Sequence, residues 1–283
     1  RRSFITAGAG AGIASVFRAP IGGLLFTLEE VSSFWDIRLA WQTFFCCLMA
    51  TFTTDLLSSS FYGFVYRGHF GFFEAEKRII FWNLLDMNVL AFLPTIFLGM
   101  LGGLLGALFV SLNIKINKLR MQFFNSIPKL SLRKTSKMLE TTVFLLRILL
   151  MFCISPHLFL CVAAAALLVE NGKQGITYLF KRGTHKEFGY ASLCTALAFY
   201  FTLSCWTAGS AVASGLVIPM LYTGALYGRI IGLILVSIFG VQTNEYGAWI
   251  DPGLFATIGA AAFFSGVSRL TISLTVIMVS MFS

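Results

Sequence analysis

Long apolar segments, separated by short polar stretches, make up most of this chain. They run approximately over residues 4–28, 39–57, 84–114, 141–168, 190–207, 216–239 and 254–282. A helix that crosses a bilayer needs about 20 apolar residues, so several of these segments are long enough to span a membrane. The pattern therefore predicts an all-α, multi-helix integral membrane protein.

Proline or glycine interrupts the apolar pattern at three places. These are Ala19-Pro20, residues 215–219 and residues 251–253. Within a membrane, a helix can break only where protein or a water-filled cavity satisfies the backbone groups that the break frees. We therefore expect broken and re-entrant helices, with polar sites near the breaks.

The composition favours lipid over water as the surroundings of the chain. Hydrophobic residues make up 57% of it and charged residues 12%, whereas soluble domains contain about 25% charged residues. Dense small residues, at 7–12, 99–106 and 259–262, would let helices approach one another closely. We expect most of these glycines to serve packing only.

The net charge of +9 comes from 21 Lys and Arg against 12 Asp and Glu. Basic residues gather in a predicted loop at 115–137, which indicates a cytoplasmic side under the positive-inside rule; binding to anionic lipid is a weaker alternative. The polar stretches at 61–80 and 169–189 would then face the other side. No aromatic-basic motif accompanies the charge, so nucleic-acid binding is not expected.

Cysteine and histidine give no sign of a metal site or a redox centre. None of the six cysteines forms a CxxC pair, and all lie in apolar stretches, where a thiol behaves as a small hydrophobe. The three histidines are scattered, so we predict no metal and no cofactor. Both chain ends are abrupt, and we expect a fragment truncated at both ends. Residues 163–166, four alanines, are either native or joined sequence.

The chain contains an internal repeat. Residues 8–18 and 259–269 match at one constant spacing, with identical residues at Gly8, Ala9, Ala11, Val16 and Arg18 and at their counterparts. Ile21 and Ile272 match at the same spacing. Weak symmetry between two membrane halves is typical of secondary transporters, whose binding site lies at the interface of the repeats. The pattern does not distinguish an inverted from a parallel repeat.

The acidic pair Glu29-Glu30 follows the first apolar segment. Acidic groups in a membrane segment are costly and often belong to proton relays. Low dielectric and a neighbouring acid can also raise the pKa of a carboxyl toward neutrality. Glu30 and Glu29 are therefore candidate proton-transfer residues. The alternative is that the pair simply lies in water at the end of a helix.

A second candidate site lies at Gly215, Leu216, Val217 and Ile218. A glycine-led break that opens a long apolar helix leaves backbone N–H groups without a partner, and these groups and the helix dipole favour an anion. An anion site built from amides needs no cationic side chain, so an ion can bind and still leave. The alternative is a kink without a ligand.

Three stretches of the chain closely resemble the CLC chloride channels and transporters. They begin with residues 7–30, which contain Phe17-Arg18-Ala19-Pro20 and Glu29-Glu30, and continue with residues 215–229 and 259–277. The stretches occur in the family's order and run from one end of the chain to the other. Residues 32–35, 204–207 and 251–253 look most like the late-endosomal and lysosomal exchanger branch.

The resemblance implies a CLC-type inverted-repeat fold and a homodimer with one pore per subunit. Residues 1–160 would hold the remainder of the first half and the start of the second, and residues 161–283 the rest of the second half. The resemblance implies that Glu30 is the inner proton-transfer glutamate, and that the amides of Leu216 and Val217 bind the central anion. The serine anion motif and gating glutamate would precede Arg1, and the pore tyrosine and regulatory domains would follow Ser283.

Two positions depart from the family pattern. Val217 stands where the family usually has Phe, which would change packing along the pore while leaving backbone amides in place. Ser280 lies opposite Glu29 in the repeat, where the family often keeps an acid. Either this chain differs there, or its last residues are misjoined.

These observations predict a chloride/proton antiporter in the lipid bilayer, with chloride and protons as its transported ligands. The alternatives are a passive voltage-gated chloride channel of the same fold, a membrane enzyme that uses Glu29 and Glu30 as an acid/base pair, and a non-transporting scaffold. The enzyme lacks a companion nucleophile or metal cluster, so we expect no enzyme. We expect an endosomal, lysosomal or other intracellular membrane, with the plasma membrane as an alternative and an accessory membrane subunit as a further partner.

Overall fold

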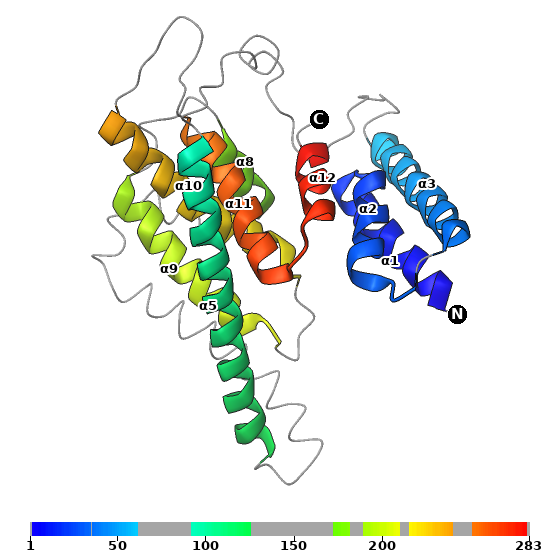
Figure 1. Cartoon of the computed structure of the whole chain (residues 1–283), viewed down its shortest axis with the longest axis horizontal. Helices are drawn as coiled ribbons and strands as arrows, with labels where there is room; N and C mark the ends of the chain where they lie inside the picture. Colours follow the sequence, from blue (N-terminus) through cyan, green and yellow to red (C-terminus); the bar gives the residue numbers. More distant parts are fainter. Residues whose placement is uncertain are drawn as a thin grey trace, which may run out of the picture. The chain divides into compact units, whose positions relative to one another are not determined.

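The computed structural model describes residues 2–34, 36–61, 92–125, 172–181, 189–209, 215–239 and 251–281. These residues are almost entirely helical, in agreement with the all-α prediction (Figure 1). The apolar segment 141–168, the alanines at 163–166, Trp35 and the polar stretch at 62–80 lie outside the described residues.

The chain divides into two compact units. The first contains Arg1–Leu85 and Ser268–Ser283, and the second contains Asp86–Val267. This division differs from the expected boundary at residues 160 and 161. That boundary concerns the symmetric halves of the fold rather than compact units, so it stays a prediction.

The first unit is built around two helices in series, α1 (Arg2–Phe17) and α2 (Pro20–Phe26). A π-helical turn, η1 (Thr27–Val31), continues α2. α1 packs against α2 and α3 (Ile37–Phe61), and α12 (Ile272–Met281) packs against α2. Figure 1 shows these four α-helices side by side. The unit therefore joins the two ends of the chain.

The predicted repeat is present in the backbone as well as in the residues. Arg18, between α1 and α2, has a φ of 53°, and its repeat counterpart Arg269, between α11 (Pro252–Ser268) and α12, has a φ of 62°. Residues other than glycine seldom adopt this left-handed conformation. The apolar segments 4–28 and 254–282 therefore each form two helices, broken at the same position of the repeat.

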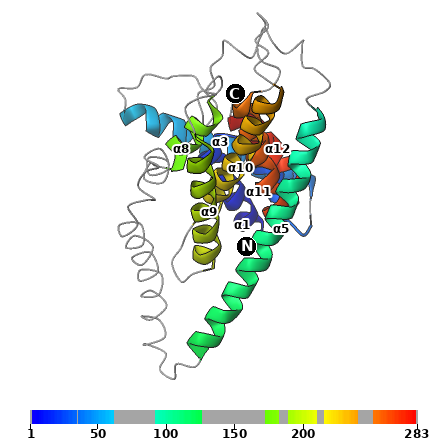
Figure 2. The same ribbon diagram turned by 90° about the vertical axis from the view of Figure 1, so that its left-hand side faces the viewer.

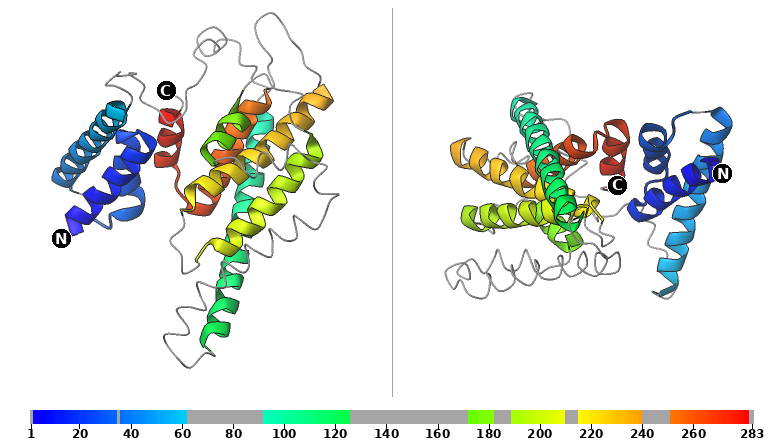
Figure 3. Two further views of the ribbon diagram at one scale, coloured as in Figure 1. Left: turned by 180° about the vertical axis from the view of Figure 1, so that it is seen from behind. Right: turned by 90° about the horizontal axis from the view of Figure 1, so that it is seen from below.

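The second unit contains α5 (Phe92–Asn125), α8 (Gly172–Phe180), α9 (Tyr190–Thr207), α10 (Val217–Phe239) and α11. α9 packs against α5 and α10, and α10 packs against α8. Figure 2 and both views of Figure 3 show α9 and α10 side by side. α9 has the bounds that its apolar segment predicts.

The prediction of a basic loop at 115–137 is wrong for the first part of this range. α5 continues without a break through Lys115, Lys118 and Arg120 to Asn125, beyond the end of the apolar segment at residue 114. Lys and Arg are good helix formers, and positive charge is favourable near the C-terminal end of a helix. The change from apolar to basic residues therefore marks the end of the apolar surface, not the end of the helix.

Small residues bring the helices of the second unit into close contact, as predicted. A Cβ atom on Gly228 of α10 would lie 2.3 Å from the carbonyl oxygen of Phe255 on α11. A Cβ atom on Gly259 of α11 would lie 2.7 Å from the carbonyl oxygen of Gly224. Gly224 and Gly228 are one turn apart, the spacing at which helix backbones approach closely in membranes.

Two described helices are long and apolar enough to cross a bilayer, over Phe92–Gln122 and Val217–Ile238. Large apolar side chains are also exposed on α3 and α5, among them Trp41 at 69%, Phe45 at 63%, Leu93 at 68% and Leu104 at 68%. An apolar surface of this kind is unfavourable in water and suits contact with lipid.

The close packing predicts opposite effects for two glycines of α5. A Cβ atom on Gly106 would lie 2.8 Å from the carbonyl carbon of Gly266, whereas one on Gly103 would meet nothing within 4 Å. We expect Gly106→Ala to destabilise the fold by about 1–3 kcal/mol through overpacking, and Gly103→Ala to be neutral or stabilising by up to about 1 kcal/mol. Thermal unfolding in detergent measures both; equal effects would contradict the α5–α11 contact.

Candidate proton and anion sites at helix ends

The acidic pair lies on η1, directly beyond Leu28, the last residue of the apolar segment. The amide of Ser32 donates to the carbonyl of Thr27 at 2.9 Å, five residues back, and this bond closes the π-helical turn. Single π-helical turns are frequent at functional sites. Although Glu29 and Glu30 are adjacent on this turn, their surroundings are different.

Glu29 binds the start of α12 through four hydrogen bonds. Its Oε1 atom accepts from the backbone amide and the hydroxyl of Thr271, both at 2.7 Å. Its Oε2 atom accepts from the amide and the hydroxyl of Ser273, at 3.1 and 2.6 Å. We refer to this arrangement as the Glu29 clamp. A carboxylate at a helix N-terminus satisfies amides that have no acceptor within the helix.

The clamp holds Glu29 in its ionised form. Partial desolvation raises the pKa of Glu29, but the hydrogen bonds from Ser273 and Thr271 outweigh it and lower the pKa from 4.5 to about 2. Hydrogen bonds to the charged form of a carboxyl favour that form. The contribution of the clamp to stability is thus complete above a pH of about 4.5 and is lost as the pH falls toward 2.

Glu30 is exposed, in contrast to its neighbour. Among the residues that the structure describes, no hydrogen bond or ion pair of its carboxyl group is found. An acid that exchanges protons needs access to water or to another relay group. Of the pair, Glu30 has the surroundings that proton exchange requires.

The candidate anion site lies at the N-terminus of α10, which begins at Val217 as the glycine-led break predicts. The amide of Met220 donates to the carbonyl of Leu216 at 3.1 Å, so Leu216 is the N-cap residue. The amides of Leu216, Val217 and Ile218 then have no acceptor within the helix, and Pro219 has no N–H. The apolar side chain of Leu216 cannot cap them, and among the described residues no acceptor of these amides is found.

Side chains of α5 bind the C-terminal end of α9, which lies eight positions before Gly215. Asn113 donates to the carbonyls of Cys205 and Ala208, at 3.1 and 2.9 Å. Arg120 donates to the carbonyl of Trp206 at 2.6 Å, and its guanidinium carbon lies 5.7 Å from the centre of the Trp206 ring. A cation at a helix C-terminus is favourable. Asn117 donates to Asn113 at 3.0 Å. Asn113, Asn117 and Arg120 thus form a row of polar side chains along α5.

A second arginine serves the C-terminal end of α8. Arg229 of α10 is fully buried, and its guanidinium donates to the carbonyls of Tyr178 and Lys181, at 3.3 Å each, and to that of Leu179. A buried charge is tolerated only where such partners surround it. Arg229 therefore fixes the end of α8 against α10.

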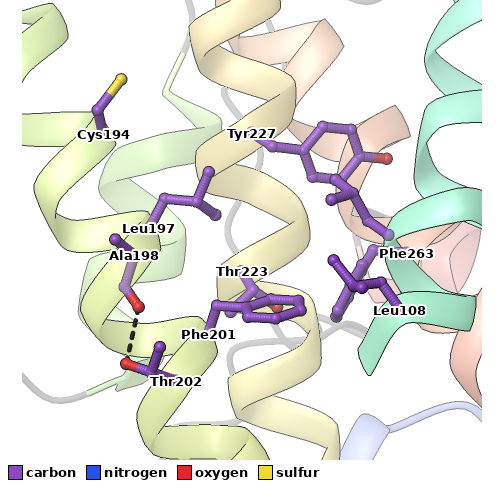
Figure 4. A pocket seen from close by; sticks show the side chains of 10 residues that line it. Leu108, Cys194, Leu197, Ala198, Phe201, Thr202, Thr223, Tyr227 and Phe263 are labelled. Carbon is purple, nitrogen blue, oxygen red and sulfur yellow. Dashed lines mark hydrogen bonds between the residues drawn. The ribbon is translucent and has the colours of Figure 1, made fainter. Parts of the chain in front are cut away.

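The second unit also contains a pocket of about 370 Å³ between α5, α9, α10 and α11 (Figure 4). Its lining is mainly apolar, with Leu108, Phe201 and Phe263 prominent. The hydroxyls of Thr202 and Thr223 donate to carbonyls of their own helices. This lining offers no charge and no row of amides, so it does not suit an anion.

Comparison with known proteins decides the family. The family model described as voltage gated chloride channel matches residues 1–283. The chain belongs to this CLC family. The CLC chain is 32% identical to chloride channel protein D of Dictyostelium discoideum, over 99% of its length and 36% of the relative. It is also 32% identical to H(+)/Cl(−) exchange transporter 7 of Homo sapiens, over 98% of its length and 36% of the relative.

Solved structures confirm the fold. A crystal structure of a eukaryotic CLC transporter matches 99% of the CLC chain and 40% of its own, with a TM-score of 0.64 and 25% identity. A slow cyanobacterial Cl−/H+ antiporter matches 99% and 56%, with a TM-score of 0.69 and 21% identity. The expected CLC-type membrane fold is therefore confirmed. The CLC chain spans about a third of the length of the curated relatives above.

Sequence reasoning identified the acidic pair and the amide site but missed the residues that support them. Thr271 and Ser273, the donors of the Glu29 clamp, follow a helix break at Arg269, and hydroxyl residues are common at helix starts. Arg229 is a charged residue in an apolar helix, which signals a special environment. Asn113, Asn117 and Arg120 share one face of α5 at helical spacing. Each signal is visible in the sequence, but the partners are not.

The buried arginine predicts a loss of stability on substitution. Arg229→Met keeps much of the side-chain volume but leaves the carbonyls of Tyr178 and Leu179 without these donors. We expect it to lower the free energy of unfolding by about 1–3 kcal/mol. The exposed Arg38→Met is the control for loss of charge. Thermal unfolding of purified protein measures both, and equal stability would contradict this role of Arg229.

The row on α5 predicts different effects for two neighbouring charges. Arg120→Gln removes the cation at the end of α9, whereas Lys118→Gln removes an exposed charge two positions earlier on α5. We expect Arg120→Gln to lower stability by about 1.5–3 kcal/mol and to slow chloride uptake by reconstituted full-length protein. Lys118→Gln should preserve both. A similar loss in the two variants would show that charge alone matters.

Proposed function

We propose that this chain is part of a chloride/proton antiporter. The observation that carries the proposal is the division of the acidic pair: Glu29 is bound and ionised, while the carboxyl group of Glu30 is exposed. This division occurs in a CLC chain that is 32% identical to proteins named H(+)/Cl(−) exchange transporter 7.

Anion and proton would use separate groups. Chloride would bind at the start of α10, where Gly215, Leu216, Val217 and Ile218 offer backbone amides and the positive end of a helix dipole. The proton would pass through Glu30. Glu30 lies in the first unit, and the amides lie in the second. Chloride would be a transported ligand, and the exchange would need no cofactor.

The amide site suits transport because its attraction is limited. Backbone dipoles can replace part of the hydration shell of an anion without adding a full positive charge. An anion can therefore enter the site and still leave it. Val217 sits within this first turn, but a change of its side chain leaves its amide in place.

A passive chloride channel on the same fold is the second candidate. It is favoured by the family description and by the name chloride channel protein D for a relative that is 32% identical. The two candidates differ in one measurable property, the movement of protons against a chloride gradient.

We further propose a homodimer in an endosomal, lysosomal or other intracellular membrane, and an accessory membrane subunit as a further partner. The sequence resemblance to the exchanger branch supports this setting. A scaffold without transport and a membrane enzyme are weaker alternatives, since the relatives carry the names of channels and exchangers.

Proton flux driven by a chloride gradient tests the antiport proposal. The full-length protein is reconstituted into vesicles, and both ions are followed at once. We expect Glu30→Gln to abolish proton flux while chloride still moves, because the amide cannot take up a proton at transport pH. The exposed acid of the same unit, Asp36→Asn, is the matched control and should leave coupling intact. Unchanged coupling in Glu30→Gln, or no proton flux in the unmodified protein, would reject the proposal.

A further inference from the structure

The Glu29 clamp joins two segments that lie 242 to 244 positions apart in sequence. Each carboxylate oxygen serves one residue: Oε1 accepts both groups of Thr271, and Oε2 accepts both groups of Ser273. A carboxylate that accepts four hydrogen bonds has little freedom to rotate, and charge-assisted hydrogen bonds are the stronger ones. The clamp is therefore a rigid connection and not an incidental contact.

The start of α12 depends on this external carboxylate. The carbonyl of Thr271 accepts from the amide of Thr275 at 3.3 Å, which makes Thr271 the N-cap residue of α12. An N-cap threonine usually turns its hydroxyl toward its own helix, but here the hydroxyl donates to Glu29. Glu29 takes the place of a capping side chain.

Packing next to the clamp fixes the position of α2 along α12. A Cβ atom on Gly22 would lie 2.6 Å from Cγ1 of Ile277, so the two helices are in close contact there. Gly22 and Glu29 lie on consecutive parts of one continuous helical segment, α2 and η1. With two points of attachment, this segment cannot slide along α12 without breaking the clamp.

Glu30 shares the short turn η1 with Glu29, so the clamp also determines where Glu30 lies. The turn has five residues, and its closing hydrogen bond runs from Ser32 to Thr27. A change in the position of Glu29 would move the backbone of Glu30 with it. A shift of about 1 Å in a reacting group can have a large effect on its chemistry.

The internal repeat shows that the clamp has no symmetric copy. The repeat pairs Glu29 with Ser280, and it pairs Thr271 and Ser273 with Pro20 and Gly22. A reciprocal clamp would need a carboxylate at 280, where this chain has a hydroxyl, and two donor residues at 20 and 22. Pro20 has no N–H and Gly22 has no hydroxyl. The clamp therefore forms only between Glu29, the neighbour of Glu30, and the start of α12. It has no counterpart between residue 280 and the start of α2.

From this geometry we propose that Glu29 is a positioning residue: it binds the N-terminus of α12, and thereby holds Glu30 in place for proton transfer, without carrying the proton itself. The inference rests on the proposed function and deepens it. It assigns different roles to two acids that the sequence presents as a pair.

Removal of the donors, with the acid left in place, tests the inference. Thr271→Val combined with Ser273→Ala deletes both hydroxyls of the clamp but keeps the Glu29 carboxyl group. In full-length protein reconstituted into vesicles, we expect this double variant to lose most of its proton flux per chloride, as Glu29→Gln does. Thr271→Ser, which keeps a hydroxyl, should preserve coupling, and so should Thr53→Val, a matched change on the exposed side of α3, where the hydroxyl donates to the carbonyl of Met49.

Each alternative gives a different result. If Glu29 carried the proton, the double variant would keep its coupling while Glu29→Gln lost it. If the clamp served stability alone, all clamp variants would unfold at lower temperature with the ratio of protons to chloride unchanged. Either result would overturn the inference. Loss of coupling in Glu30→Gln, measured in the same vesicles, tests the proposed function separately.

Discussion

Every helix that ends within or near a bilayer leaves backbone groups that lipid cannot satisfy, and this constraint shapes the described part of the chain. The ends of three helices are bound by side chains from other segments. Glu29 accepts hydrogen bonds from the start of α12. Arg120 and its neighbours on α5 donate to the end of α9, and Arg229 donates to the end of α8. These three helix ends are therefore stabilised by residues that lie far away in the sequence.

The sign of each contact follows the helix dipole. Amides at a helix start attract negative charge, and carbonyls at a helix end attract positive charge. The chain places a glutamate at one start and arginines at two ends. At the start of α10, with apolar Leu216 as N-cap, no acidic side chain from the described residues binds the amides. Under the proposed function, a diffusing anion would take the role there that Glu29 has at α12, and the helix dipole would account for both sites.

Local patterns predicted much of the fold, and the contacts across the chain were beyond their reach. Residues 190–207 were predicted as one helix, because apolar length and a glycine before Tyr190 define it locally. The repeat, the break before Val217 and the close packing at Gly259 were also readable. In contrast, α5 runs past residue 114 because lysine and arginine continue a helix as well as leucine does. The division between Glu29 and Glu30 depends on Thr271 and Ser273, more than 240 positions away, which no local pattern specifies.

The two left-handed arginines give the repeat an evolutionary meaning. Arg18 pairs with Asp55 of α3, their atoms 3.3 Å apart, while Arg269 is exposed. The side chains have diverged in their surroundings, yet the backbone bend is the same in both copies. If the halves arose by duplication of one ancestral segment, both copies have kept the bend while the surroundings of the two arginines came to differ. The bend is what allows a new helix start to form in each copy, and each start could then acquire its own ligand.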